Sequence, residues 1–123
     1  MAFSGYLENA VLNHVFGGSA YTAPTTLYVG LLGADPNSGG TEPSADSYYR
    51  RTITFSVAQN LASNSNSIDF LINDPWGNLT YCGVYDALTG GNLLTSAALQ
   101  SAIDGNDLEQ VIFNIGQINI RLT

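Results

Sequence analysis

Positive charge is nearly absent from this sequence. The 123 residues contain no lysine and only three arginines, against ten Asp and Glu, which gives a formal net charge of −7 at pH 7. Binding to phosphate backbones depends on Lys and Arg side chains, so such a surface repels nucleic acid. It also repels anionic lipid, which attracts basic segments. We therefore expect neither nucleic acid nor membrane among the partners.

Cysteine and histidine each occur once, as Cys82 and His14. A single cysteine excludes an intramolecular disulfide and a zinc site built from cysteines of this chain, which favours folding in a reducing cell compartment. Cys82 falls within an expected strand, where a free cysteine acts as a small hydrophobe. His14 falls on a helix stripe that should face the core, so a catalytic triad is not indicated. We expect neither enzymatic activity nor a cofactor.

Long hydrophobic runs are also missing. No stretch approaches 18 consecutive apolar residues, which excludes a transmembrane helix, and the first residues lack the basic start of a secretory signal. Hydrophobic residues still make up 45% of the chain and charged residues only 11%, a balance opposite to that of disordered proteins. The length predicts a single domain over residues 1–123 with a true apolar core.

One helix is expected, over residues 3–16. Ser4 can cap its start, and Gly17-Gly18 can end it. The stripe that should face the core consists of Phe3, Leu7, Ala10 and His14. Leu12 and Phe16 fall on the opposite side, four residues apart. Either the last turn tucks under a loop, or these two side chains contact another subunit.

The remainder, residues 26–122, alternates between short apolar segments and turn-rich loops, which is typical of strands. The expected strands are 26–32, 51–57, 67–72, 79–86, 93–99, 108–115 and 117–122. The last two should meet in a hairpin at Gly116, whereas 33–47 and 58–66 should be loops. The pattern indicates a mainly β fold: an antiparallel, jelly-roll-like β-sandwich of about seven strands with one N-terminal amphipathic helix.

Alternation also predicts where individual side chains point. Ile53, Phe55 and Val57 should share one face of their strand, and Asp69 should face solvent. Trp76, between Pro75 and Gly77, can be a core plug or an exposed anchor, and a core position is expected in a small sandwich.

Two clusters of side chains are candidate binding sites. The turn at 104–107 offers oxygen ligands of the kind that calcium favours, but its spacing departs from a calcium-binding loop and is ordinary turn chemistry, so no metal site is predicted. The single basic and aromatic cluster comprises Tyr48, Tyr49, Arg50 and Arg51. Tyr and Arg are enriched at protein interfaces, which makes these four candidate contact residues. Alternatively, the two arginines neutralise Asp46 and Glu42.

Several stretches carry a resemblance that runs in order along nearly the whole chain. They include the segments 7–18, 20–31 and 40–44, then Tyr49-Arg50-Arg51, Trp76-Gly77, Gly83-Val84-Tyr85-Asp86-Ala87 and Thr89-Gly90-Gly91-Asn92-Leu93-Leu94. In these the chain resembles a family of small virion proteins of tailed bacteriophages. The resemblance implies a β-rich, non-enzymatic structural subunit, described in the family as a tail or fibre protein and compatible with capsid decoration. Residues 95–110 depart from the family in being more acidic.

We predict from this resemblance a capsid cement or decoration protein on the outer head surface, where an acidic protein need not touch DNA. Its partners would be the major capsid protein and further copies of itself. The expected contact residues are Leu12, Phe16, Tyr48, Tyr49, Arg50 and Arg51, together with the loop 33–47. One alternative is a tail-associated collar, baseplate or fibre subunit. The other is a carbohydrate-binding module that attaches the phage to host glycans through Tyr48, Tyr49 and Trp76.

Overall fold

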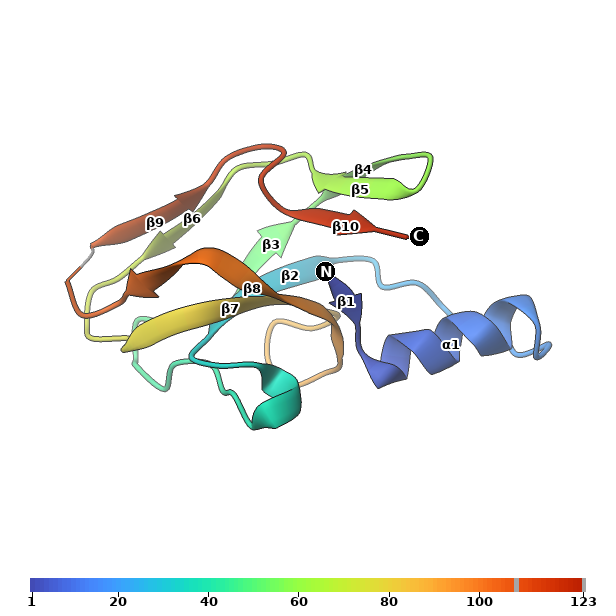
Figure 1. Cartoon of the computed structure of the whole chain (residues 1–123), viewed down its shortest axis with the longest axis horizontal. Coiled ribbons are helices and arrows are strands. Elements are labelled where there is room, and N and C mark those ends of the chain that lie inside the picture. Colours follow the sequence, from blue (N-terminus) through green and yellow to red (C-terminus); the bar gives the residue numbers. More distant parts are fainter. Residues whose placement is uncertain (108, 123) are drawn as a thin grey trace.

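The computed structural model describes residues 1–107 and 109–122 (Figure 1). The described residues form one α-helix, α1 (Gly5–Val15), one 3₁₀ turn, η1 (Pro36–Ser38), and ten strands. The strands are β1 (Ala2–Phe3), β2 (Leu27–Leu32), β3 (Arg51–Ile53), β4 (Phe55–Ala58), β5 (Leu61–Asn64), β6 (Ile68–Leu71), β7 (Asn78–Tyr85), β8 (Leu93–Asp104), β9 (Gln110–Phe113) and β10 (Asn119–Arg121). The expected mainly β sandwich with an N-terminal helix is confirmed.

The strands form two layers. One layer is a five-stranded sheet of order β1-β8-β7-β2-β3, and the other consists of the sheets β10-β5-β4 and β6-β9. Every paired strand is antiparallel to its neighbour. Figure 1 shows the two smaller sheets side by side above the larger one. The hairpin expected from 79–86 and 93–99 is present as β7 and β8.

The core lies between these layers because alternate residues of each strand face the opposite layer. Phe70 of β6 is fully buried at its centre, and its ring meets the edges or faces of three other aromatic rings, those of Tyr48, Trp76 and Phe113. Trp76 is 5% exposed, so its expected core position is confirmed. Its indole N–H donates to the Ser47 hydroxyl at 2.8 Å, which satisfies the polar end of the ring.

The strand expected at 51–57 is in fact two strands in different sheets. β3 pairs with β2 in the large sheet, whereas β4 pairs with β5 in the small one. The change occurs at Thr54, whose N–H donates to the Asn66 side chain at 2.9 Å instead of to a neighbouring strand. Ile53 is therefore buried while Val57 is 74% exposed, and the prediction of one shared face is wrong.

The loop expected at 58–66 contains the short strand β5. Apolar alternation does not reveal this strand, because Ser63 and Asn64 are polar. The hairpin expected at Gly116 is also wrong, because β9 pairs with β6 and β10 pairs with β5. Buried Asn64 separates them: its side chain donates to Asn114 O at 3.0 Å and accepts from the Ile118 N–H at 2.8 Å. Leu108, the expected first residue of the strand 108–115, lies outside the described residues.

Helix α1 is shorter than expected, since Phe3 belongs to β1. Ser4 is the N-cap as predicted, and its hydroxyl accepts from the Leu7 N–H at 3.1 Å. No residue of α1 is buried, and His14 is exposed, so its expected core position is wrong. The physical reason is that only the start of the helix packs on β1 and β8, while the rest projects beyond the sheets (Figure 1).

Candidate interaction surface

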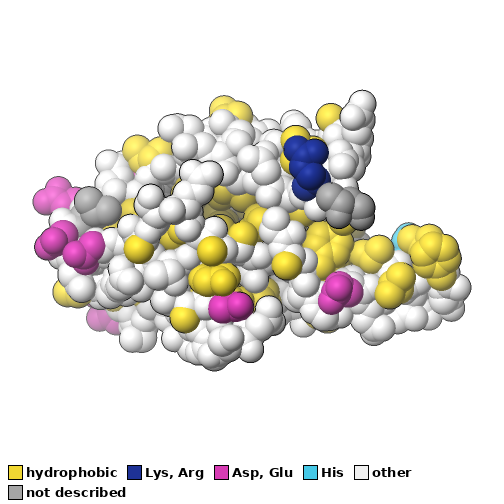
Figure 2. All heavy atoms as spheres, in the orientation of Figure 1, with side chains coloured by type: hydrophobic (Ala, Val, Ile, Leu, Met, Phe, Trp, Pro, Cys, Tyr) yellow, Lys and Arg dark blue, Asp and Glu magenta, His cyan; other side chains and the backbone are white. Residues whose placement is uncertain are grey.

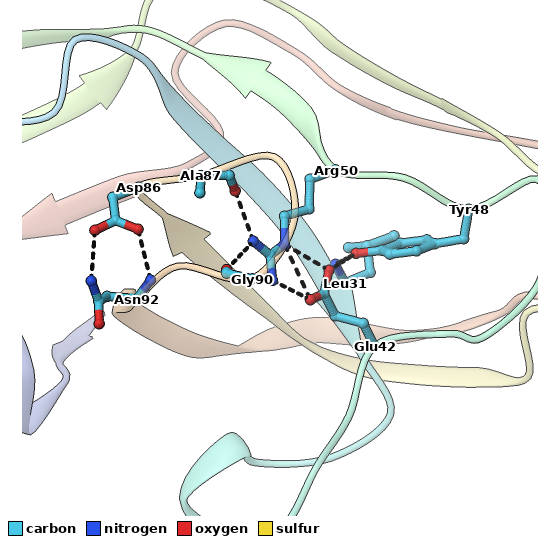
Figure 3. A network of polar contacts seen from close by, with 8 residues as sticks. All are labelled: Leu31, Glu42, Tyr48, Arg50, Asp86, Ala87, Gly90 and Asn92. Atoms are coloured by element: carbon cyan, nitrogen blue, oxygen red, sulfur yellow. Dashed lines mark hydrogen bonds and ion pairs between the residues drawn. The ribbon is translucent and has the colours of Figure 1, made fainter.

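The loop 33–47 is joined to the large sheet by a largely buried polar group that we call the Arg50 cluster, consisting of Glu42, Tyr48, Arg50 and Tyr85. Figure 3 shows Glu42, Tyr48 and Arg50 with their hydrogen-bond partners. The Arg50 side chain forms an ion pair with Glu42, with Nη2 and Oε1 2.7 Å apart, and Nε donates to the same carboxylate at 3.1 Å. Its guanidinium carbon lies 3.5 Å from the centre of the Tyr85 ring. Such a fork-shaped contact combines charge, direction and stacking.

Arg50 also reaches the turn between β7 and β8. Its Nη1 donates to the carbonyl oxygens of Ala87 at 2.7 Å and Gly90 at 2.9 Å. The same turn is closed by Asp86, whose carboxylate accepts from the Asn92 backbone and side-chain amides at 2.7 and 3.0 Å (Figure 3). One arginine therefore fastens two loops that are about forty residues apart in sequence to the edge of the large sheet.

Tyr48 completes the cluster as both donor and acceptor. Its hydroxyl donates to Glu42 and accepts from the Leu31 N–H at 3.0 Å. Burial, and then the neighbouring Glu42 carboxylate, raise the pKa of Tyr48 far above its ordinary value. Burial likewise raises the pKa of Tyr85 to about 12. Both phenols stay protonated at physiological pH, so the cluster functions as a fixed scaffold.

Gly30 of β2 makes room for this cluster. A Cβ atom at Gly30 would lie 2.6 Å from Glu42 Oε2 and 2.7 Å from the Tyr48 hydroxyl, both closer than real Cβ atoms approach oxygen. Its partner across the ladder is Gly83 of β7. No pattern in the sequence marks either glycine as a requirement of the site.

The four expected contact residues at 48–51 divide into two pairs. Arg50 is 8% exposed and Tyr48 is half-buried, and both are engaged in the Arg50 cluster. Tyr49 is 51% exposed, with the guanidinium carbon of Arg51 3.8 Å from its ring centre. The alternative hypothesis, that Glu42 neutralises an arginine, agrees with the ion pair between Glu42 and Arg50. Their interface role stays a prediction, and Tyr49 and Arg51 are the pair that a partner can reach.

Asp74 anchors the end of the loop 33–47 through hydrogen bonds that should weaken in acid. Its carboxylate accepts from the Asp46 and Ser47 N–H groups, each at 3.1 Å, and from the Ser47 hydroxyl. The Ser47 hydroxyl, more than the backbone amides, lowers the pKa of Asp74 below its ordinary 3.8. A lowered folded-state pKa means that the stabilisation is present above pH 3.8 and is lost as pH falls through the folded value.

We therefore expect Asp74→Asn to destabilise the protein at pH 7, and the difference from the wild type to shrink as pH falls below about 3.8. Urea unfolding at a series of pH values measures this. Glu8→Gln, at an exposed carboxylate on α1 and outside the groove that Asp74 lines, is the control. A wild-type minus Asp74→Asn difference that does not change with pH contradicts the assignment.

The outer part of α1 exposes an apolar surface that we call the helix tip, consisting of Val11, Leu12, Val15 and Phe16. Leu12, Val15 and Phe16 are 58%, 61% and 82% exposed. Because residues three and four apart share a helix face, these three form one continuous strip. The expectation that Leu12 and Phe16 tuck under a loop is wrong, and the hypothesis of a contact with another subunit remains. Figure 2 shows hydrophobic side chains covering this end.

An apolar groove of about 350 Å³ opens between the two layers beside the start of the helix. We call it the sheet groove, and its apolar lining includes Leu27, Phe55, Val57, Leu61, Leu94 and Leu122. These residues come from β2, β4, β5, β8 and the segment after β10. Sequence reasoning missed it, because only the change of sheet at Thr54 turns Phe55 and Val57 toward this opening.

The side chains with the greatest chemical reactivity are engaged or shielded. The exposed His14 ring accepts from the Tyr21 N–H at 2.9 Å through Nδ1. Burial raises the pKa of the Cys82 thiol to about 11, which leaves it a protonated, inert side chain at neutral pH. Within residues 1–107 and 109–122, no three His, Cys, Asp or Glu side chains gather in a metal-binding group.

The family model described as podophage GP4 fiber I protein gp80 matches residues 2–121. The chain belongs to this family. No curated protein matches the sequence. The expected resemblance to structural proteins of phage virions is therefore confirmed, and it extends over nearly the whole chain.

Membership in the fibre I family makes this chain a structural protein of the phage virion, of fibre or tail type. The family description favours the tail-associated alternative over capsid decoration. The structure also weakens the glycan-binding alternative, because Trp76 is buried and Tyr48 is half-buried against the core, which leaves Tyr49 as the one of its three aromatic residues that is exposed. In the described part of the chain, no helix is long and apolar enough to span a membrane.

Proposed function

We propose that this protein is a tail-associated, fibre-type structural subunit of a podophage particle. Its partners are another structural protein of the tail and further copies of the same chain. The observation that carries the proposal is the family match, which covers residues 2–121 and thus both layers of the sandwich and the helix. A match over one hairpin would support only a shared element of structure.

The architecture supports a structural subunit whose contact loops are fixed. Arg50 connects the loop 33–47, the β7–β8 turn and the large sheet through charged hydrogen bonds, so the loops that a partner would meet are held in place. The exposed apolar helix tip and sheet groove offer contact area that a monomer leaves in water.

The acidic charge does not distinguish tail from head. A net charge of −7 disfavours contact with packaged DNA, and both the outer head and the tail exterior avoid that contact. The choice of the tail therefore depends on the family description and not on electrostatics.

Dissociation of purified virions tests the location. Heads and tails are separated on a density gradient, and the chain is quantified in each fraction by mass spectrometry against the major capsid protein. We expect it in the tail fraction, at a copy number far below that of the coat. A known tail protein and the coat protein serve as internal controls for the separation. Recovery with the heads, at a simple stoichiometric ratio to the coat, would overturn the proposal and restore capsid decoration.

A further inference from the structure

Two unpartnered apolar surfaces of opposite shape lie on this one chain. The helix tip protrudes, with Phe16 82% and Val15 61% exposed, and the sheet groove is a hollow of about 350 Å³. Exposed apolar surface of this kind marks sites of association. An amphipathic helix that lays residues spaced i, i+3 and i+4 into an apolar groove is a recurrent mode of recognition.

The helix cannot fill the groove of its own chain. Phe3 and Leu7, at the start of the helical segment, line one side of the groove, and the helix then leads away from it (Figure 1). The linker after the helix fixes this direction: the Ser19 N–H donates to Asn13 O at 3.1 Å, and Tyr21 bonds to His14 and packs against Tyr6. The helix tip is thus held out as a rigid projection, which reduces the entropy lost when it docks.

Charge distribution favours a second copy of this chain as the occupant. Two molecules with a net charge of −7 repel each other unless they meet where neither is acidic. The residues that line the sheet groove include no charged side chain, and the helix carries no acid beyond Glu8 in its first turns. In Figure 2 most of the visible acidic side chains lie at the end of the molecule away from the helix. The lining of a second groove, formed by Leu71–Pro75 and Gly105–Asp107, contains Asp74, Asp107 and Glu109.

We propose that Leu12, Val15 and Phe16 of one copy dock in the sheet groove of the next copy. The contact is heterologous, because each chain gives its helix tip and receives another in a different surface. Such contacts close into a ring when the rotation between copies allows it and otherwise continue as an open chain. This contact depends on the shapes and charges of the two surfaces and applies to a subunit of either tail or head.

Complementation between two variants tests the heterologous contact. Phe16→Ser removes the largest side chain of the tip, and Val57→Asp places a charge at the rim of the groove. Both residues are more than 70% exposed, so both variants should still fold. Molar mass is measured by light scattering from about 10 µM to about 1 mM, a range that covers weak specific contacts.

We expect the wild type to associate and each variant alone to have the mass of one chain. An equimolar mixture should form a dimer, because the intact tip of Val57→Asp enters the intact groove of Phe16→Ser. Ile112→Ser, at a residue 51% exposed and outside both surfaces, should associate as the wild type does. A monomeric wild type at about 1 mM, self-association of Val57→Asp, or a mixture that remains monomeric would each overturn the proposal. Self-association of Val57→Asp would mean that helix tips pair with each other and do not enter the groove.

Discussion

Replacing Arg50 with alanine is expected to lower the free energy of unfolding by about 3–5 kcal/mol, the loss typical of breaking one partner out of a buried ion pair. Arg50 is 8% exposed and donates to Glu42, Ala87 O and Gly90 O. Without the guanidinium, Glu42 keeps a half-buried negative charge beside Tyr48, and both carbonyl groups lose a charged donor. The larger part of the loss comes from the stranded Glu42 carboxylate.

Urea unfolding followed by tryptophan fluorescence measures this loss, because Trp76 lies in the core near the Arg50 cluster. Arg51→Ala is the matched control: it removes the same side chain at the next position, where the guanidinium stacks on exposed Tyr49. The control should lose less than about 1 kcal/mol. The double variant Glu42→Ala/Arg50→Ala should lose less than the sum of the single changes, since it strands no charge. Equal losses for Arg50→Ala and Arg51→Ala would refute the structural role.

Phe70→Ala is expected to be as damaging, with a loss of about 3–5 kcal/mol, the range measured for buried aromatic residues. Phe70 is fully buried in β6, with ring centres 6.1 Å from Trp76 and 6.3 Å from Phe113. Its removal opens a cavity where the two layers meet, and the edge-to-face contacts are lost with it. At this point the two layers contact each other only through side chains. A change of strand register within either layer would therefore not fill the cavity.

Leu71→Ala is the control for this experiment, because Leu71 is the next residue of the same strand and is 47% exposed on the opposite face. Its loss should be only about 1 kcal/mol, since nearly half of its surface stays in water after folding. Thermal unfolding by circular dichroism ranks the two variants. Similar losses at the two positions would mean that β6 is not oriented as described.

The class of fold was predictable wherever alternation alone decides which side chains are buried. The β7–β8 hairpin and the buried face of β6 follow from local patterns of two to eight residues. The core position of Trp76 followed from the expected size of the sandwich, because its neighbours Pro75 and Gly77 left both positions open. The changes of sheet were not predictable. At Thr54 and around Asn64, side-chain amides replace strand partners, and their bonding partners come from distant segments, such as Ile118.

The candidate surface was predictable only in its local parts. Glu42 and Arg50 are eight residues apart, so the hypothesis of mutual neutralisation was accessible from the sequence. The two carbonyl groups that complete the Arg50 cluster lie 37 and 40 residues away, and no pattern of residue types marks them. The helix tip was visible as Leu12 and Phe16 on a second face, but the sheet groove combines residues from segments that are far apart in the sequence, from Phe3 to Leu122.

The pairing of β1 has a consequence for synthesis of the chain on the ribosome. β1 is held by β8, and the Thr95 hydroxyl donates to Ala2 O across 93 residues of sequence. At translation rates of about 5–20 residues per second, the N-terminal segment waits roughly 5–20 s before its partner strand is made. During that interval the apolar residues of α1 have been made but have no sheet to adjoin. Nascent chains on one polysome can therefore contact one another through this exposed apolar segment until β8 is made.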